Sequence, residues 1–252
     1  MRMEDVDRPR EVAGSAARIL RTLEAFGFEW DGEIMAQSTR TAHYAAALED
    51  LRARGLTFEC SCSRLTLADE DRYPGTCREG VSNRGVATAT RLRIAPGLVQ
   101  FADRIQGIYR QEVATSVGDV ILKRRDQLFA YLLAVVVDDA AQGVTHVVRG
   151  ADLLDNTPRQ IYLQRQLGLR TPSYAHVAVL SEADGSKLAK SARSVRLEEN
   201  NAVRELVTVF GLLGLSPPPS LAGSTVATAW GWALQAWDLN RVYKGLSLRL
   251  AV

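Results

Sequence analysis

The stretch Thr145-His146-Val147-Val148-Arg149-Gly150-Ala151-Asp152-Leu153-Leu154 decides the fold class. Residues 145–149 are largely β-branched and apolar, which is typical of a strand, and the pattern that follows predicts a helix over about residues 157–167. A second strand is expected over residues 174–180. A strand, a helix and a strand in this order are typical of a mostly parallel sheet covered by helices, so the sequence predicts an α/β fold.

The alternation of helices and strands extends toward the N-terminus. Helical spacing predicts a first helix that Gly27 stops; its apolar residues are Val12, Ile19, Leu20, Leu23 and Phe26. Ser38 resembles the N-cap of a second helix, which Gly55 closes before a strand over residues 56–60. Short strands are expected between residues 90 and 122, as an inserted β-rich subdomain. After residue 191, two helical segments, 201–213 and 226–237, predict a short helical tail.

Composition bounds the class of protein. The 252 residues are 46% hydrophobic and 24% charged, the balance of a globular protein with one large domain or two small ones. No run approaches the ~18 apolar residues of a membrane span, and the N-terminus lacks a secretion signal, so a cytoplasmic location is expected. The net charge of +2 does not demand a nucleic-acid partner. Seven basic residues cluster locally, and they are interpreted as solvated strand and loop residues rather than as phosphate contacts: Arg91, Arg93, Arg104, Arg110, Lys123, Arg124 and Arg125.

Cys60, Cys62 and Cys77 lie in one short segment. An odd number of cysteines in a chain of cytosolic character argues against a disulfide framework and favours metal binding. Three thiolates and a fourth ligand would suit tetrahedral Zn²⁺. Tyr73 would be an unusual fourth ligand, and Asp69, Glu70 or Asp71 compete for that position. Cysteines packed in a core without metal remain an equal alternative on the pattern alone.

The segment Asp184-Gly185-Ser186-Lys187-Leu188-Ala189-Lys190-Ser191 follows a strand that should end at the carboxyl edge of the sheet. Ligands of open α/β sheets bind at that edge. Lysine ammonium groups there would neutralise charge on a triphosphate and its pyrophosphate leaving group. Taken alone, such a loop is more often merely solvated.

Arg149 ends a strand at the same edge. A guanidinium in this place could grip a carboxylate in bidentate fashion, and pairing with Asp138, Asp139 or Asp152 is an equally weighted structural alternative. The three histidines, His43, His146 and His176, form no catalytic triad, and His146 and His176 are expected to be structural.

In their order along the chain, these segments resemble the glutamyl branch of the class I aminoacyl-tRNA synthetases. The resemblance covers most of the chain before Ser191: residues 1–10, the cysteine-rich knuckle, and residues 128–139, 145–154, 174–176 and 187–191. The last block is similar to the lysine–serine loop that closes over ATP in this class, with Ala189 where serine is commoner. Only residues 192–252 follow, too few for an anticodon-reading domain, which favours the shorter glutamyl-queuosine tRNA(Asp) synthetases.

The resemblance implies the chemistry. It places the glutamate pocket on Glu4, Tyr131 and Arg149, the ATP contacts on Lys187, Lys190 and Ser191 with Lys190 catalytic, and a zinc site on Cys60, Cys62, Tyr73 and Cys77. It implies ATP, Mg²⁺ and Zn²⁺ as cofactors, and glutamate and queuosine-bearing tRNA(Asp) as substrates of a monomer. Glutamate would attack the α-phosphate of ATP and then pass from the adenylate to a hydroxyl of queuosine.

The resemblance also predicts the domain organisation. A Rossmann-like catalytic domain is expected in two halves, residues 1–59 and 128–191, with a zinc-containing β subdomain over 60–127 and a helical tail over 192–252. Family members begin with a strand, a glycine turn and a helix whose His-x-Gly-His-type motif binds ATP phosphates, and nothing before Glu4 matches this segment. A catalytic domain incomplete at its N-terminus, with impaired ATP binding, is therefore expected.

Three hypotheses about the function remain open at this point. The first is an active ligase whose true start lies upstream of Met1. The second is a non-catalytic, zinc-containing RNA-binding or regulatory remnant. The third is a fragment of a glutamyl-tRNA synthetase.

Overall fold

The structure is a computed structural model that describes residues 1–63, 65–67, 70, 72–181 and 197–249. Its helices are α1 (Ser15–Ala25), α2 (Thr41–Ala53), α3 (Val113–Ser116), α4 (Tyr131–Ala141), α5 (Thr157–Gln166), α6 (Ala202–Leu212) and α7 (Val226–Ala236). Its strands are β1 (Arg2–Met3), β2 (Met35–Ala36), β3 (Thr57–Cys60), β4 (Ala89–Leu92), β5 (Leu98–Asp103), β6 (Gly107–Glu112), β7 (Val120–Lys123), β8 (His146–Gly150), β9 (Ser173–Val177), β10 (Val179–Ser181) and β11 (Ser247–Arg249).

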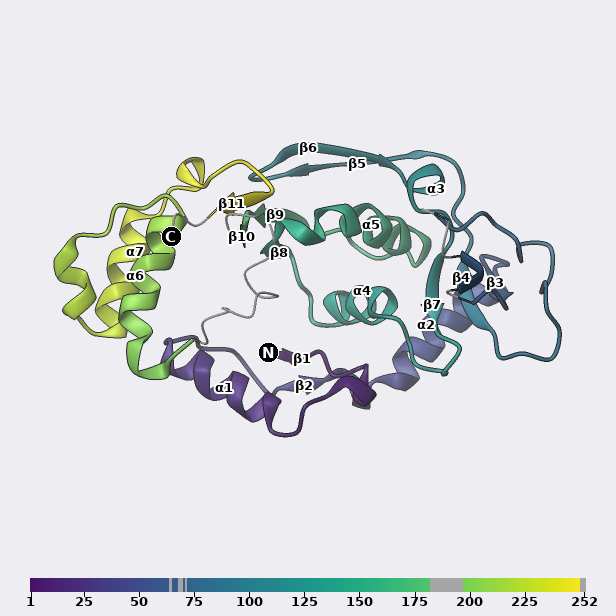
Figure 1. Cartoon of the computed structure of the whole chain (residues 1–252), viewed down its shortest axis with the longest axis horizontal. Helices are drawn as coiled ribbons and strands as arrows, with labels where there is room; N and C mark the ends of the chain where they lie inside the picture. Colours follow the sequence, from purple (N-terminus) through teal and green to yellow (C-terminus); the bar gives the residue numbers. More distant parts are fainter. Residues whose placement is uncertain (64, 68–69, 71, 182–196, 250–252) are drawn as a thin grey trace.

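The strand–helix–strand unit that the sequence predicts lies at the centre of the molecule (Figure 1). β8 and β9 pair in parallel from His146↔Ser173 to Gly150↔Val177, and α5 connects them. The antiparallel β5–β6 hairpin extends this sheet, because β5 meets β9 in parallel at Asp103↔Tyr174. The resulting order is β6-β5-β9-β8. The predicted α/β class is thus confirmed.

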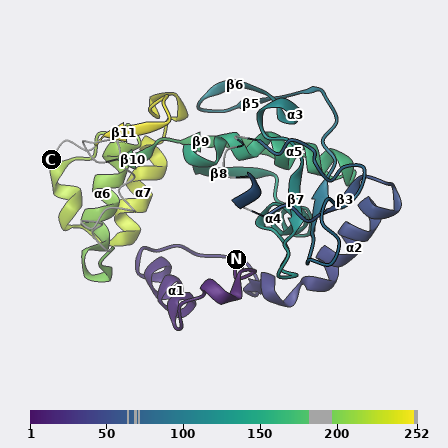
Figure 2. The same cartoon turned by 45° about the vertical axis from the view of Figure 1, so that its right-hand side comes forward.

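Three smaller sheets surround this unit. β1 and β2 pair in parallel, β3, β4 and β7 form an antiparallel sheet, and β10 pairs in parallel with β11. The antiparallel sheet lies with α2 at the opposite end of the molecule from α6 and α7 (Figures 1 and 2). No described helix is long and apolar enough to cross a membrane.

The main core lies between α2, α4, α5 and the strands. Helical periodicity puts Leu51 of α2, Leu133 of α4 and Leu163 of α5 on inward faces, and all three are fully buried. A second core joins distant parts of the chain, since Phe26 packs with residues of α6 and α7. Gly27 ends the first helix at a φ of +74°, as predicted, and Trp230 of α7 donates a hydrogen bond to the Phe26 carbonyl.

Two local predictions were wrong. Ser38 does not cap α2, which begins at Thr41; the Ser38 side chain and backbone N–H instead donate to the carboxylate of Asp5. The strand expected over residues 174–180 divides into β9 and β10, which pair in different sheets. In both cases a long-range partner determines the local structure.

Candidate functional site

A cavity of about 680 Å³ lies between β1 and β8. Glu4, Tyr131 and Arg149 all line it, so three of the predicted site residues come together although up to 145 positions of sequence separate them. β8 is an edge strand among the described residues, and Val148 on it is 70% exposed at this cavity. Lys187, Lys190 and Ser191 lie outside the described residues.

Arg149 is held by three neutral groups. Its Nε donates to Nε2 of His176 at 3.0 Å, and its Nη2 donates to Oγ1 of Thr157 and Oε1 of Gln160, both at 2.8 Å. Of the three aspartates weighed from the sequence, Asp138 bonds Arg40 and Asp139 bonds Arg2. The Nη1 group of Arg149 donates no hydrogen bond within the part of the chain described above, so this edge of the guanidinium can meet a ligand.

Tyr131 begins α4 and is 40% exposed, with its ring at the cavity. Burial raises the pKa of its hydroxyl, the charge of Glu4 raises it further, and the charge of Arg149 lowers it. A carboxylate and a guanidinium thus act on one hydroxyl in the same cavity. Such an arrangement suits a zwitterion with an additional carboxylate, because both signs of ligand charge find an opposite partner.

Arg2 also lines the cavity, although no sequence motif pointed to it. Its Nη2 pairs with Glu4 at 2.9 Å, while its Nη1 pairs with Asp139 of α4 at 2.7 Å and donates to Gln142. The Arg2 side chain is only 14% exposed. Arg2 therefore fixes the carboxylate of Glu4 against α4.

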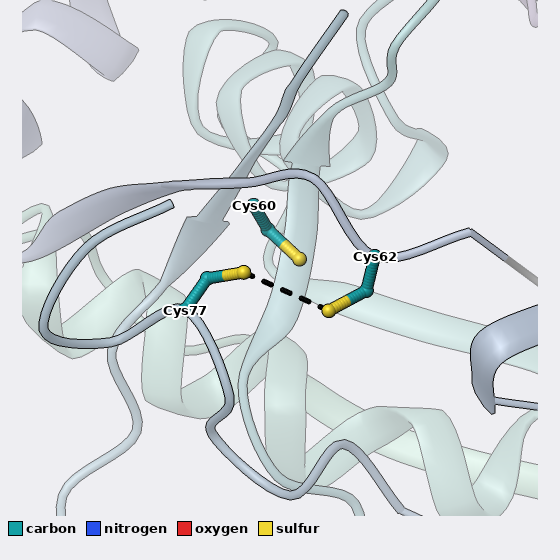
Figure 3. A group of neighbouring side chains, drawn as sticks. All are labelled: Cys60, Cys62 and Cys77. Atoms are coloured by element: carbon teal, nitrogen blue, oxygen red, sulfur yellow. Dashed lines mark hydrogen bonds between the residues drawn. The ribbon is translucent and has the colours of Figure 1, made fainter. Parts of the chain in front are cut away.

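The three cysteines converge on one point (Figure 3). Their sulfur atoms all lie within 4.8 Å of one another, and the Sγ atoms of Cys62 and Cys77 are 3.6 Å apart. Tetrahedral Zn²⁺ with Zn–S bonds of ~2.3 Å would hold its sulfurs roughly 3.8 Å apart. The cysteines form no disulfide, so the donor set fits a metal ion of this kind.

Tyr73 closes the same cluster. Its hydroxyl lies 3.5 Å from Sγ of Cys60 and accepts a hydrogen bond from the backbone N–H of Cys77 at 2.8 Å. Arg91 stacks over its ring at 3.8 Å, and Phe58 packs beside it. Of the competing carboxylates, Asp69 and Asp71 lie outside the described residues.

The cluster favours a thiolate at one position. Although burial opposes ionisation of Cys77, hydrogen bonds with Ser82 and Ser61 and with the Cys62 thiol lower the pKa of its thiol to about 5. Burial and the other two thiols raise the pKa of Cys62. A metal ion binds thiolates, so one ligand is already in the required state near neutral pH.

The sequence predicts a structural role for His176 but not the residues that it contacts. It is fully buried and hydrogen-bonded, which agrees with a structural histidine, whereas His146 is exposed. His176 also contacts Arg149, and Asp103 of β5 contacts His176. Neither contact can be read from the sequence, because the three residues meet only through the pairing of β5, β9 and β8.

Comparison with known proteins gives the family of the chain. The family model described as "tRNA synthetases class I (E and Q), catalytic domain" matches residues 1–219. A glutamyl-Q tRNA(Asp) synthetase of Thiobacillus denitrificans is 49% identical over 249 residues, 96% of this chain and 83% of that protein. One of Pseudomonas aeruginosa is 48% identical over 243 residues, with the same coverage.

Solved structures show the same fold. The crystal structure of glutamate-tRNA synthetase from Elizabethkingia anophelis has a TM-score of 0.77 at 20% sequence identity, covering 99% of this chain and 60% of that one. The chain therefore spans about three fifths of the length of that enzyme. With the family match over most of its length and relatives at 49% identity, the chain belongs to the class I tRNA synthetases (E and Q), in the glutamyl-Q tRNA(Asp) synthetase family.

Proposed function

We propose that this protein activates glutamate with ATP and transfers it to queuosine in tRNA(Asp). The observation that carries the proposal is the shared cavity of Glu4, Tyr131 and Arg149. The curated relatives named above, called glutamyl-Q tRNA(Asp) synthetases, support the choice of substrates.

The ammonium group and one carboxylate of glutamate have proposed partners. Glu4 accepts hydrogen bonds from the substrate ammonium, Tyr131 bonds the same group, and Arg149 pairs with a carboxylate through its available Nη1. Lys187, Lys190 and Ser191 contact ATP, with Lys190 stabilising the charge that develops as the carboxylate attacks the α-phosphate. Mg²⁺ would supply further charge neutralisation on the phosphates.

Cys60, Cys62, Cys77 and Tyr73 are the proposed zinc ligands. Zinc there would be structural, since the thiols and the phenol would fill all four tetrahedral positions. Residues 60–127 then form the zinc-containing subdomain inserted between the catalytic segments 1–59 and 128–191, with 192–252 as the tail. We place the protein in the cytoplasm as a monomer.

The test is glutamate-dependent ATP–pyrophosphate exchange by the full chain, followed by transfer of labelled glutamate to tRNA. Arg149→Gln should lower kcat/KM for glutamate at least about 100-fold, because a charge partner of the substrate is lost. Arg170→Gln, at an exposed arginine, is the matched control and should leave the rate unchanged.

The tRNA step separates the candidate functions. Queuosine-containing tRNA(Asp) should accept glutamate, and tRNA(Asp) without queuosine and tRNA(Glu) should not. Charging of tRNA(Glu) would instead indicate a glutamyl-tRNA synthetase. Exchange that is absent, or that Arg149→Gln leaves intact, would refute the proposed glutamate site.

A further inference from the structure

Arg149 is the end of a buried hydrogen-bonded chain that starts at Asp103. Nδ1 of His176 lies 2.6 Å from Oδ2 of Asp103, and Nε2 of His176 accepts from Nε of Arg149 at 3.0 Å. The side chains of Asp103 and His176 are both 0% exposed. The three residues come from β5, β9 and β8, so the chain of bonds crosses the central sheet (Figure 1).

The hydrogen-bond donors around Asp103 keep its carboxyl group ionised. Its Oδ1 accepts from the backbone N–H groups of Ile105, Gln106 and His176 at 2.8–3.1 Å. Burial opposes ionisation of this carboxyl, but these bonds and the one from His176 lower its pKa below the ordinary value. Asp103 is thus a carboxylate with only Oδ2 left for His176, and it can only accept there.

That constraint selects one form of His176. Nδ1 must carry the proton that it donates to Asp103, so in the neutral ring Nε2 has a lone pair for Arg149. Thr157, which lies 3.2 Å from Nε2, accepts from Arg149 and can donate to the carbonyl of Leu153. A protonated His176 would instead present an N–H and a positive charge to the guanidinium.

We infer that Asp103 and His176 are positioning residues for substrate binding, which hold Arg149 by keeping His176 neutral with its proton on Nδ1. The inference rests on the proposed role of Arg149 and adds to it a pH dependence. The bond to Nε2 fixes the Nε edge of the guanidinium, while Thr157 and Gln160 fix Nη2, so Nη1 is directed to the ligand.

The groups around His176 have opposing effects on its pKa. Burial lowers its pKa below the ordinary 6.5, Asp103 raises it, and Arg149 lowers it, with a smaller raising effect of Asp152; Tyr174 stacks on its ring. The net direction is downward, so His176 is neutral above pH 6.5 and becomes protonated only as the pH falls below that value. Glutamate binding should weaken over the same range.

The experiment measures the Kd of the full chain for glutamate by calorimetry between pH 7.5 and pH 5. In the wild type, Kd should be constant down to about pH 6.5 and rise several-fold below it. His176→Gln keeps an acceptor for Arg149 but cannot be protonated, so Kd should stay near the wild-type value at pH 7.5 and lose its dependence on pH. His176→Leu removes the acceptor and should raise Kd about tenfold at every pH.

Asp103→Asn tests the hydrogen bond between Asp103 and His176. An amide N–H in place of Oδ2 would donate to Nδ1 and move the histidine proton to Nε2, so Kd should rise about tenfold at pH 7.5 without loss of the fold. Since the chain has only three histidines, ¹⁵N NMR of the imidazoles can read the proton position directly, with His176→Gln assigning the signal. The wild type should show Nδ1–H and Asp103→Asn should show Nε2–H.

The outcomes separate the two proposals. If the wild type does not bind glutamate at all, the proposed function fails and the positioning role fails with it. If Arg149→Gln abolishes binding while His176→Leu and Asp103→Asn bind normally, the positioning role alone is overturned. A wild-type His176 with its proton on Nε2 would overturn it as well, and folding of each variant is checked by circular dichroism.

Discussion

Asp138 is a fully buried carboxylate on α4, which burial would make costly without partners. It accepts from Arg40 Nε at 2.5 Å, from Gln37 Nε2 at 3.0 Å and from the Tyr44 hydroxyl at 2.5 Å. The three partners come from α2 and the turn before it. This network therefore ties α2 to α4 inside the main core.

We expect Tyr44→Phe to lower the free energy of unfolding by about 1–3 kcal/mol, because one buried carboxylate oxygen loses a donor while the ring still fills its space. Urea unfolding measures the change. Tyr243→Phe is the matched control, since Tyr243 is 48% exposed, and it should shift stability by less than about 0.5 kcal/mol. Equal effects of the two variants would show that the hydroxyl of Tyr44 contributes nothing.

At the scale of elements, the turn between α3 and β7 contacts the cysteine-rich knuckle. Gly118 has a φ of +75°, and a Cβ there would lie 2.4 Å from the carbonyl oxygen of Tyr73. The backbone N–H of Tyr73 also donates to the carbonyl of Val117. The knuckle is therefore held against this turn by close backbone contact, for which only glycine leaves room.

Gly118→Ala should destabilise the protein more than Gly107→Ala, which provides the matched control. Gly107 has a φ of +86° but open space around its Cβ position, so alanine there costs only the backbone strain, about 1 kcal/mol. At Gly118 the overlap with Tyr73 adds to the same strain, and a loss of roughly 3 kcal/mol is expected. Denaturant titration of both variants measures the two losses of unfolding free energy. Similar losses would mean that the knuckle shifts to make room for the alanine at position 118 without a loss of stability.

The elements were predictable where local pattern controls them. Helical spacing predicted helices where α1, α2 and α5 lie, and Gly27 and Gly55 mark helix ends. Ser38 was misread as a cap because its partner, Asp5, lies 33 positions away. The pairing of β5 with β9 could not be predicted from the sequence either, because strand partners depend on tertiary packing rather than on propensity.

The candidate site was predictable in part for the same reason. Glu4, Tyr131 and Arg149 came from resemblance to a family, and the structure places all three at one cavity. Their roles as ligands of glutamate stay a prediction. The supporting residues Arg2, Asp103 and His176 act through contacts across the fold, which no local motif encodes.

At the scale of the whole molecule, the cysteine cluster and the main core are separate sources of stability. The buried hydrophobic cluster of the knuckle consists of Phe58, Cys60, Tyr73 and Cys77 among the described residues, a set too small to hold this region by apolar burial alone. The main core, by contrast, extends over α2, α4, α5 and their strands. A metal ion at the knuckle would therefore stabilise one region rather than the entire fold.

Removal of zinc should consequently unfold the knuckle and leave the central sheet intact. Protein purified without chelator should contain one zinc ion per chain by elemental analysis, and chelation should abolish hydrogen-exchange protection in the knuckle, residues 60–88, while protection in 131–177 persists. Cys62→Ser should show this exchange pattern without chelator, and Ser63→Ala beside it should not. A protein that contains no zinc, yet keeps the knuckle protected in Cys62→Ser, would show that packing alone holds the three cysteines together.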